Sequence, residues 1–79
     1  MDGSRLLVID DDPMIRSQLR HLFEADRCEV QDASSLAAAR AAALDFRPEI
    51  VLLDYELPDG TALDLLPYLK ENAPDVPVL

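Results

Sequence analysis

The sequence predicts a doubly wound α/β fold, in which a parallel β-sheet is covered by helices on both faces. Short apolar runs alternate with longer segments of helical periodicity, in the order strand, helix, strand, helix, strand, helix, strand. This order is typical of parallel strands joined by right-handed crossovers. The strand predicted at 49–53 is also apolar from Ile50 to Leu53, as expected for a strand buried on both faces. With 79 residues the chain forms at most one domain.

The first strand and the first helix are predicted over residues 5–9 and 13–25. RLLVI is a short apolar run with β-branched members, and an acidic cluster follows it. Pro13 stands where proline is favoured as the first helical residue, which makes Asp12 the N-cap. The apolar residues of the helix are spaced so that they share one face: Ile15, Leu19 and Leu22.

The second strand and the second helix are predicted over residues 28–33 and 35–46. CEVQDA alternates apolar and polar residues, as a strand near the edge of a sheet does. Ser34 or Ser35 then caps an alanine-rich segment with a strong intrinsic helix propensity. The helix is expected to end before Pro48, because the residue preceding a proline is disfavoured in the α conformation.

The last predicted elements are a strand at 49–53, a helix at 61–72 and the start of a strand at 76–79. The turn Pro58-Asp59-Gly60 separates the first two. We expect Pro67 to kink the helix or to weaken its first half, because proline lacks the amide donor. The apolar face of this helix is predicted to consist of Leu63, Leu66 and Leu69.

Composition and charge exclude several classes of function. Sixteen acidic and seven basic residues give a formal charge of −9, so we expect no direct binding of nucleic acid and no association with membranes. The N-terminal segment becomes acidic where a secretory signal is small and neutral, which predicts a cytoplasmic location. The single cysteine, Cys28, cannot form an internal disulfide and is expected in the core.

Aspartates follow two of the predicted strands. Asp10 and Asp11 come after the first strand, and Asp54 comes after the third. Ligands of open α/β sheets bind beyond the carboxyl ends of the strands, so these side chains converge if the two strands are neighbours. Their repulsion requires protons or a cation, and Mg²⁺ is the hard, oxygen-liganded ion that fits best. Asp12 and Asp59 are instead interpreted as a helix cap and a turn former.

These residues carry a resemblance to a known family. LLVIDDDP followed by IVLLDYELPDG is similar to the receiver domains of two-component response regulators. In that family a strand ending in an acidic pair is joined, through two helices and a strand, to a strand ending in the phosphoacceptor aspartate. The resemblance covers Arg5 to Leu79 and implies a flavodoxin-like (CheY-like) sheet of strand order 2-1-3-4-5, truncated after the start of the fourth strand.

The resemblance implies roles for individual residues. Asp54 matches the phosphoacceptor, and the Mg²⁺ ligands match Asp10, Asp11, Asp54 and the backbone carbonyl of Glu56. The family is regulatory rather than enzymatic, and its phosphoryl donor is a sensor histidine kinase or a histidine phosphotransferase. Its phosphoryl-contacting Ser or Thr and Lys match no position up to Leu79, so we expect phosphorylation and switching of this form to be impaired.

Other interpretations are weaker. A haloacid-dehalogenase-type phosphatase would use Asp54 and Glu56, but it gives no role to the acidic pair after the first strand. A calcium-binding loop starting at Asp54 lacks the glycine and the glutamate needed at its sixth and twelfth positions. A receiver-like interaction module that never uses phosphate stays open as an alternative.

The sequence also predicts association. In the implied strand order the fourth strand flanks the third, and only residues 76–79 represent it, which leaves a strand edge and apolar helix faces without cover. We therefore expect the chain to be part of a longer polypeptide or to form an oligomer, such as an intertwined dimer.

Overall fold

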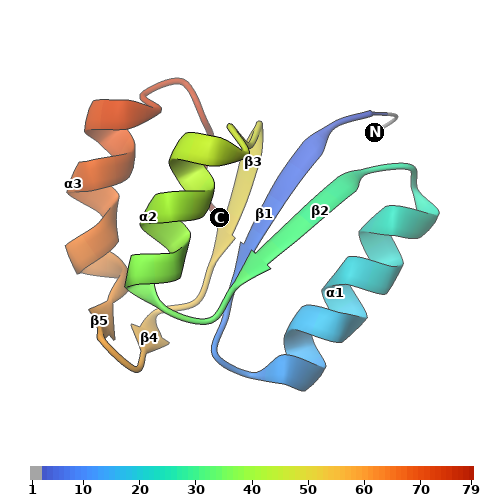
Figure 1. The fold of residues 1–79 in the computed structure, drawn as a ribbon, viewed down its shortest axis with the longest axis horizontal. Helices are drawn as coiled ribbons and strands as arrows, with labels where there is room; N and C mark the ends of the chain where they lie inside the picture. The colour runs from blue at the N-terminus through green and yellow to red at the C-terminus, as the bar shows by residue number, and fades with distance from the viewer. Residues whose placement is uncertain (1–2) are drawn as a thin grey trace.

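The computed structural model of the protein describes residues 3–79 and contains a parallel sheet with helices on both faces (Figure 1). The sheet has the order β2-β1-β3 and consists of β1 (Arg5–Ile9), β2 (Glu29–Ala33) and β3 (Ile50–Leu53). The helices are α1 (Pro13–Ala25), α2 (Leu36–Asp45) and α3 (Ala62–Asn72). A short antiparallel hairpin joins β3 to α3 and consists of β4 (Glu56–Leu57) and β5 (Gly60–Thr61). The predicted fold class is confirmed.

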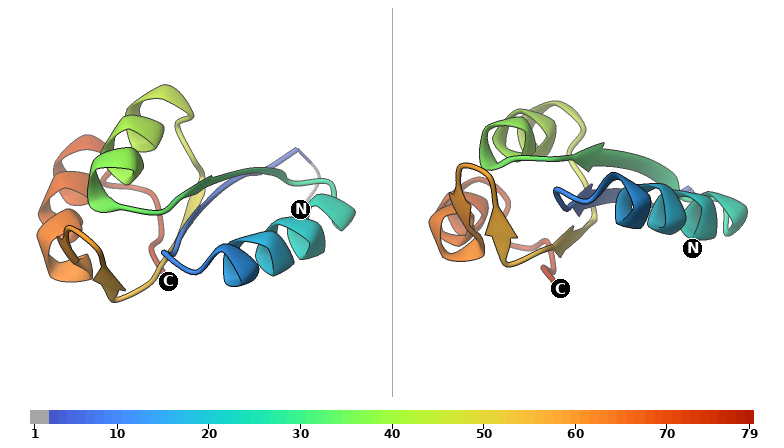
Figure 2. Two further views of the ribbon diagram at one scale, coloured as in Figure 1. Left: turned by 60° about the horizontal axis from the view of Figure 1, so that its bottom comes forward. Right: turned by 90° about the horizontal axis from the view of Figure 1, so that it is seen from below.

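The central strand β1 contributes side chains to both faces of the sheet. Leu6 and Val8 belong to one apolar cluster, and Leu7 and Ile9 belong to another, because successive residues of a strand point to opposite faces. All four are at most 1% exposed. Helix α1 lies over the first face, and α2 and α3 lie over the second (Figure 2). This two-sided burial explains why β1 is apolar at consecutive positions.

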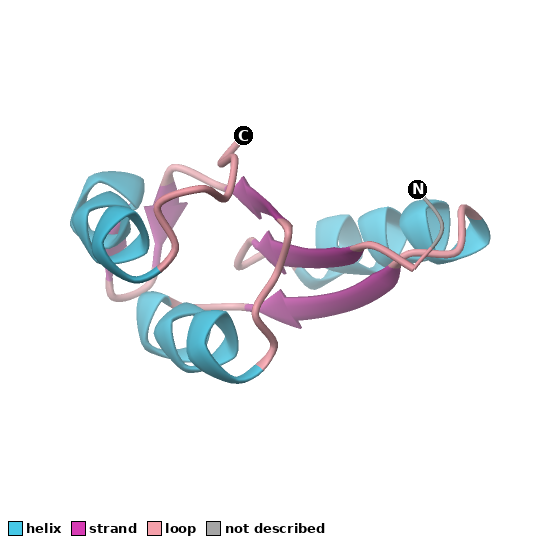
Figure 3. Cartoon of the chain, turned by 90° about the horizontal axis from the view of Figure 1, so that it is seen from above, coloured by secondary structure: helices cyan, strands magenta, loops and turns pink. Residues whose placement is uncertain are grey.

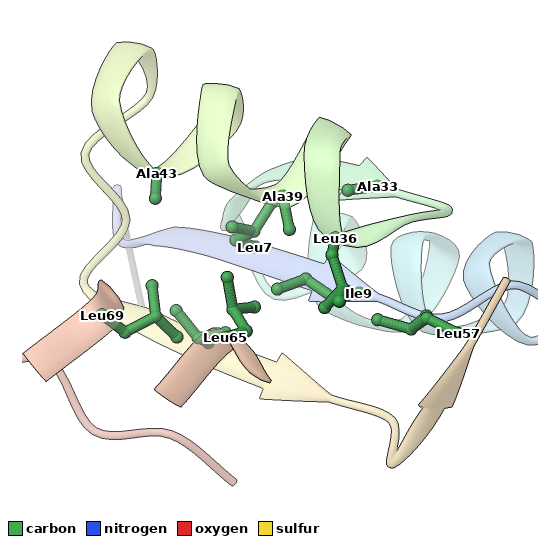
Figure 4. Packing of buried hydrophobic residues seen from close by; sticks show 10 residues of the cluster. Leu7, Ile9, Ala33, Leu36, Ala39, Ala43, Leu57, Leu65 and Leu69 are labelled. Atoms are coloured by element: carbon green, nitrogen blue, oxygen red, sulfur yellow. The ribbon is translucent and has the colours of Figure 1, made fainter. Parts of the chain in front are cut away.

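The larger cluster fills the space between the sheet, α2 and α3 (Figure 4). Leu36 at the start of α2 and Leu65 of α3 are 2% and 0% exposed, and Ile9 of β1 lies in the same cluster. Leu57 of β4 joins them, which anchors the hairpin after β3 to the core. Ala39 faces the sheet from α2, and its small side chain lets the helix lie close to the strands.

Helix α1 is less buried than its sequence predicts. Leu19 and Phe23 pack against the cluster on their face of the sheet, and Cys28 is buried there as expected. The prediction that Ile15 and Leu22 share the buried face is wrong, because Ile15 is 38% exposed and Leu22 is 63% exposed. No other helix lies on this face among residues 3–79, so nothing covers the flanks of the stripe (Figure 2).

Strand β3 is also less buried than predicted. Val51 is 1% exposed, but its neighbours in the strand are half-buried, because α1 contacts mainly β1 and β2. Residues 77–79 lie beside β3 and run parallel to it (Figure 3). The Val51 amide donates to the Pro77 carbonyl at 3.0 Å, and the Leu79 amide donates to the Val51 carbonyl at 2.8 Å. The segment predicted as a strand over 76–79 forms an isolated bridge between Val51 and Val78 rather than a strand.

Helix α3 corrects two expectations. It begins at Ala62 and continues through Pro67, so its first half is formed and the expected weakness there is wrong, while the alternative, a kink at Pro67, stays a prediction. Proline leaves the carbonyl four residues earlier without its helical partner, but that residue, Leu63, is 62% exposed and its carbonyl can be hydrated. The buried residues of the helix are Ala62, Leu65 and Leu69, so the predicted burial is confirmed for Leu69 and wrong for Leu63, which is exposed, and for Leu66, which is half-buried. Their spacing of three and then four follows the helical repeat, whereas the predicted stripe drifts around the helix.

Several elements begin or end one residue from the expected ranges. Strand β2 begins at Glu29 rather than at 28, and β3 begins at Ile50 rather than at 49. The two later helices start after Ser35 and Thr61, which are N-caps with extended backbones. Capping residues flank a helix without adopting its dihedral angles, which explains why these two helices begin one residue later than predicted. No helix among residues 3–79 is long and apolar enough to cross a lipid bilayer.

The burial pattern of α3 can be tested with two identical changes. Leu65→Ala is expected to lower the free energy of unfolding by about 2–5 kcal/mol, because it leaves a cavity at a side chain that is 0% exposed. Leu63→Ala is the matched control and is expected to cost about 0.5 kcal/mol or less, because that side chain is largely exposed. Urea unfolding followed by circular dichroism measures both. Equal losses would contradict the observed burial of this helix.

Candidate functional site

Three aspartates meet at the carboxyl ends of β1 and β3, toward the lower end of the view in Figure 1. Asp10 and Asp11 follow β1, and Asp54 follows β3. Each offers a carboxylate oxygen, and the three oxygens all lie within 4.8 Å of one another. They meet because β1 and β3 are direct neighbours, with Ile9 opposite Leu53. The structure thus brings together the three side chains that the sequence singles out.

Backbone hydrogen bonds hold both strand ends. The Asp10 amide donates to the Ala33 carbonyl at the end of β2 at 3.0 Å, and the Asp54 amide donates to the Ile9 carbonyl of β1 at 2.9 Å. These bonds extend the parallel ladders by one residue. Asp10 and Asp54 are therefore placed by the sheet itself and are half-buried, whereas Asp11 lies one residue farther along and is exposed.

Local hydrogen bonds orient two of the carboxylates. Oδ1 of Asp10 accepts a hydrogen bond from the Asp12 amide at 2.9 Å. Oδ1 of Asp54 accepts one from the amide of the next residue, Tyr55, also at 2.9 Å. Each of these bonds engages one oxygen, and the carboxylate carries a second one that can serve a ligand.

The donor set suits a small, hard cation. Mg²⁺ prefers oxygen ligands at about 2.1 Å in an octahedron, which places ligand oxygens about 3 Å apart when adjacent and about 4 Å apart when opposite. The three oxygens all lie within 4.8 Å of one another, which is close to these values. In the absence of a cation the three carboxylates repel one another. The side chains present therefore fit Mg²⁺.

Two further acidic residues near the cluster lie outside it. Glu56 is the first residue of β4, and its side chain is exposed and does not belong to the carboxylate cluster. The family resemblance implies that its backbone carbonyl, not its side chain, is the metal ligand. Asp12 is the N-cap of α1 as predicted, and its Oδ1 accepts hydrogen bonds from the amides of Met14 at 2.9 Å and Ile15 at 3.5 Å. Its carboxylate thus serves the helix.

Asp59 has a role that the sequence does not reveal. Its Oδ1 accepts a hydrogen bond from the Leu36 amide at 2.7 Å, and its Oδ2 accepts one from the Ala37 amide at 3.1 Å. The Ser35 hydroxyl accepts one from the Ala38 amide at 3.1 Å. Together these two side chains satisfy the first three amides of α2, which have no partner within the helix. Asp59 is therefore a long-range cap as well as a turn residue.

Gly60 lets the hairpin after Asp54 approach α2 and α3. Its φ is +152°, a conformation that other residues rarely adopt. A Cβ atom there would lie 2.5 Å from Cδ1 of Leu36 and 2.6 Å from Oδ2 of Asp64. Asp64 in turn accepts a hydrogen bond from the Thr61 amide at 2.9 Å, at the start of α3. The chain that leaves the site is thus held against both helices.

Comparison with known proteins identifies the family. The model of the response regulator receiver domain matches residues 6–79 of the chain. The chain belongs to this family. The resemblance seen in the sequence is confirmed, and the regulatory, phosphoaccepting role of receiver domains is the role of the family to which the chain belongs.

Individual relatives agree with this assignment. The receiver domain is 35% identical over 74 residues to the probable transcriptional regulatory protein TcrX of Mycobacterium tuberculosis, an alignment that covers 94% of this chain and 32% of TcrX. It superposes on the non-phosphorylated HemR receiver domain of Leptospira biflexa with a TM-score of 0.89 and 28% identity, over 96% of this chain and 61% of HemR. For the response regulator MaeR bound to beryllium trifluoride the TM-score is 0.84 and the identity 27%, over 96% and 64% of the two chains. The chain thus spans less than two thirds of each.

The cap formed by Asp59 makes the stability of the receiver domain sensitive to acid. The hydrogen bond from the Leu36 amide holds the pKa of Asp59 below its ordinary value of 3.8, and desolvation opposes this effect only in part. A carboxyl group with a lowered pKa in the folded state stabilises the fold above its unfolded pKa and loses this effect as the pH falls through the folded pKa. The loss is therefore expected below pH 3.8.

We expect Asp59→Asn to lower the thermal unfolding midpoint at neutral pH and to reduce its dependence on pH below that value. An asparagine has one acceptor oxygen and cannot receive both amides as the carboxylate does. Asp75→Asn removes the same charge at an exposed residue after α3 and is the control. Circular dichroism melts across the acidic range measure both. An unchanged pH profile in Asp59→Asn would contradict the assigned cap.

Proposed function

We propose that this receiver domain accepts a phosphoryl group on Asp54, with Mg²⁺ held by the carboxylates of Asp10, Asp11 and Asp54 and by the backbone carbonyl of Glu56. The observation that carries the proposal is the meeting of three carboxylate oxygens within 4.8 Å at the ends of two adjacent parallel strands. Ligands of open α/β sheets bind at this edge. Membership of the receiver family supports the same chemistry.

Asp54 is the nucleophile in this proposal. A carboxylate is a weak nucleophile, so transfer depends on its position and on neutralisation of charge. The hydrogen bonds to Ile9 and from Tyr55 hold the Asp54 backbone and one of its oxygens. Oδ1 of Asp54 keeps a further lone pair that would face the cation. The other carboxylate oxygen attacks phosphorus, and the bond from phosphorus to the donor breaks with its electron pair passing to the leaving group. The product is an aspartyl phosphate.

Asp10 and Asp11 hold the cation beside this nucleophile. Mg²⁺, when bound, neutralises the charges that the carboxylates and the phosphoryl oxygens bring together. The Asp12 amide orients Asp10, and Asp11 extends from the sheet edge into solvent. An exposed ligand at an open sheet edge leaves the site accessible to a macromolecular phosphoryl donor.

The structural neighbours give further support. MaeR is bound to beryllium trifluoride, a group that resembles a phosphoryl group in shape and charge. We propose a sensor histidine kinase or a histidine phosphotransferase as the donor for this chain and the cytoplasm as its location. The oligomeric state expected from the sequence stays a prediction.

The assignment of Asp54 can be tested by phosphorylation. Incubation with Mg²⁺ and acetyl phosphate is expected to add the mass of one phosphoryl group, and alkali is expected to remove it. Asp54→Asn should abolish the gain, because it replaces the nucleophilic carboxylate. Asp12→Asn makes the same chemical change at the N-cap of α1 and should retain the gain in mass. Mass spectrometry of the intact chain reads all three. A gain that persists in Asp54→Asn contradicts the assignment, and no gain in the unchanged chain favours an interaction module that does not use phosphate.

The metal ligands can be tested with two adjacent aspartates. Asp11→Asn is expected to weaken Mg²⁺ binding by about tenfold or more, because it removes a charged oxygen ligand. Asp12→Asn removes the same charge one residue away and preserves the helix cap, so the affinity should stay within about twofold of that of the unchanged chain. Isothermal titration calorimetry measures both. Equal weakening would indicate a general effect of charge rather than a ligand at Asp11.

A further inference from the structure

An arginine of α1 reaches back to the end of β1. Nη1 of Arg16 donates to the backbone carbonyl of Asp10 at 2.8 Å, and the Arg16 side chain is only 20% exposed. Arg16 is the fourth residue of α1, where a positive charge is unfavourable because the helix dipole favours negative charge near the N-terminus. Its position is therefore explained by contacts outside the helix, among them the one with Asp10, and not by helix stability.

This hydrogen bond completes the immobilisation of Asp10. The amide of Asp10 donates to the Ala33 carbonyl, its Oδ1 accepts from the Asp12 amide, and its carbonyl accepts from Arg16. The carbonyl belongs to the peptide that joins Asp10 to Asp11, and a peptide unit is planar. The hydrogen bond that fixes this carbonyl therefore also fixes the direction of the backbone from Asp10 to Asp11. Arg16 thus acts on two of the three carboxylates of the cluster.

Asp32 of β2 holds the guanidinium from its other side. Its Oδ2 lies 3.7 Å from Nε of Arg16 and 3.5 Å from Nη2 of Arg20. Arg20 also donates to the Val30 carbonyl at 2.8 Å. The two arginines lie one helical turn apart and share one carboxylate, but the hydrogen bond to Asp10 comes from Arg16.

We propose that Arg16 is a positioning residue for the cation site. It sets the peptide between Asp10 and Asp11 so that both carboxylates are directed to one cation, and Asp32 holds its guanidinium in place. Because Arg16 contacts the Asp10 backbone carbonyl and not a carboxylate of the cluster, the effect is one of geometry more than of charge. The inference rests on the proposed function, since it concerns ligands of Mg²⁺, and it adds a residue that is not itself a ligand.

The test compares the two arginines in the whole chain. Mg²⁺ is titrated into ¹⁵N-labelled protein while the amide resonances of Asp11 and Tyr55 are followed, and thermal unfolding is measured without Mg²⁺. Arg16→Ala is expected to weaken Mg²⁺ binding about tenfold, as is typical when a partner of a metal ligand is lost. Arg20→Ala loses its ion pair with the same Asp32, but should leave the affinity within about twofold of that of the unchanged chain. Thermal stability without Mg²⁺ is expected to fall in both variants.

The possible outcomes separate this inference from the proposed function. Unchanged affinity in Arg16→Ala, or equal weakening in both variants, overturns the inference and leaves the proposed metal site standing. If the unchanged chain shows no response to Mg²⁺, both are overturned. If Arg16→Ala does not fold, Arg16→Gln takes its place. Glutamine keeps the helix propensity but is too short to replace the guanidinium, so the same tenfold weakening is expected, and unchanged affinity overturns the inference.

Discussion

The parallel pairing of β1 with β3 is the constraint on which the site depends. Ile9 lies opposite Leu53, so Asp10 and Asp54, the next residues of the two strands, emerge side by side at one edge of the sheet. A crossover through α1, β2 and α2 separates these aspartates in the sequence, and only the sheet brings them together. Burial of the β1 side chains on both faces stabilises the pairing, and this offsets the repulsion that disfavours three carboxylates at one edge.

The aspartates of this chain have different roles because some of them bond the first amides of a helix and others lie at the ends of strands. Asp12 and Asp59 cap the N-termini of α1 and α2, where unpaired amides and the helix dipole favour a carboxylate. Asp10, Asp11 and Asp54 lie at strand ends, where no helix begins, and their oxygens gather around one point. The same residue type is therefore structural at a helix terminus and available for a cation at the sheet edge.

The fold was largely predictable from local patterns. The errors of that prediction have physical causes. The apolar runs of β1 and β3 and the periodicity of α1 identify the elements, because strand and helix repeats place apolar residues at different spacings. The buried face of α3 was misread because leucines occupy both sides of this helix, and burial depends on which side meets the sheet. The β4–β5 hairpin was missed because two-residue strands are too short to show a period. The exposure of Leu22 depends on the absence of a second helix on its face among residues 3–79.

The sequence by itself determined the order of the elements and the placing of Asp10, Asp11 and Asp54 directly after strands, because both follow from residues adjacent along the chain. It also identified Asp12 as a cap, since that bond joins near neighbours. Only the tertiary structure decided that Asp59 caps a helix 23 residues earlier. The same holds for Arg16, which pairs with Asp32 and bonds the carbonyl of Asp10. Such contacts join residues that come together only when the strands pair and the helices pack, so no local pattern reports them.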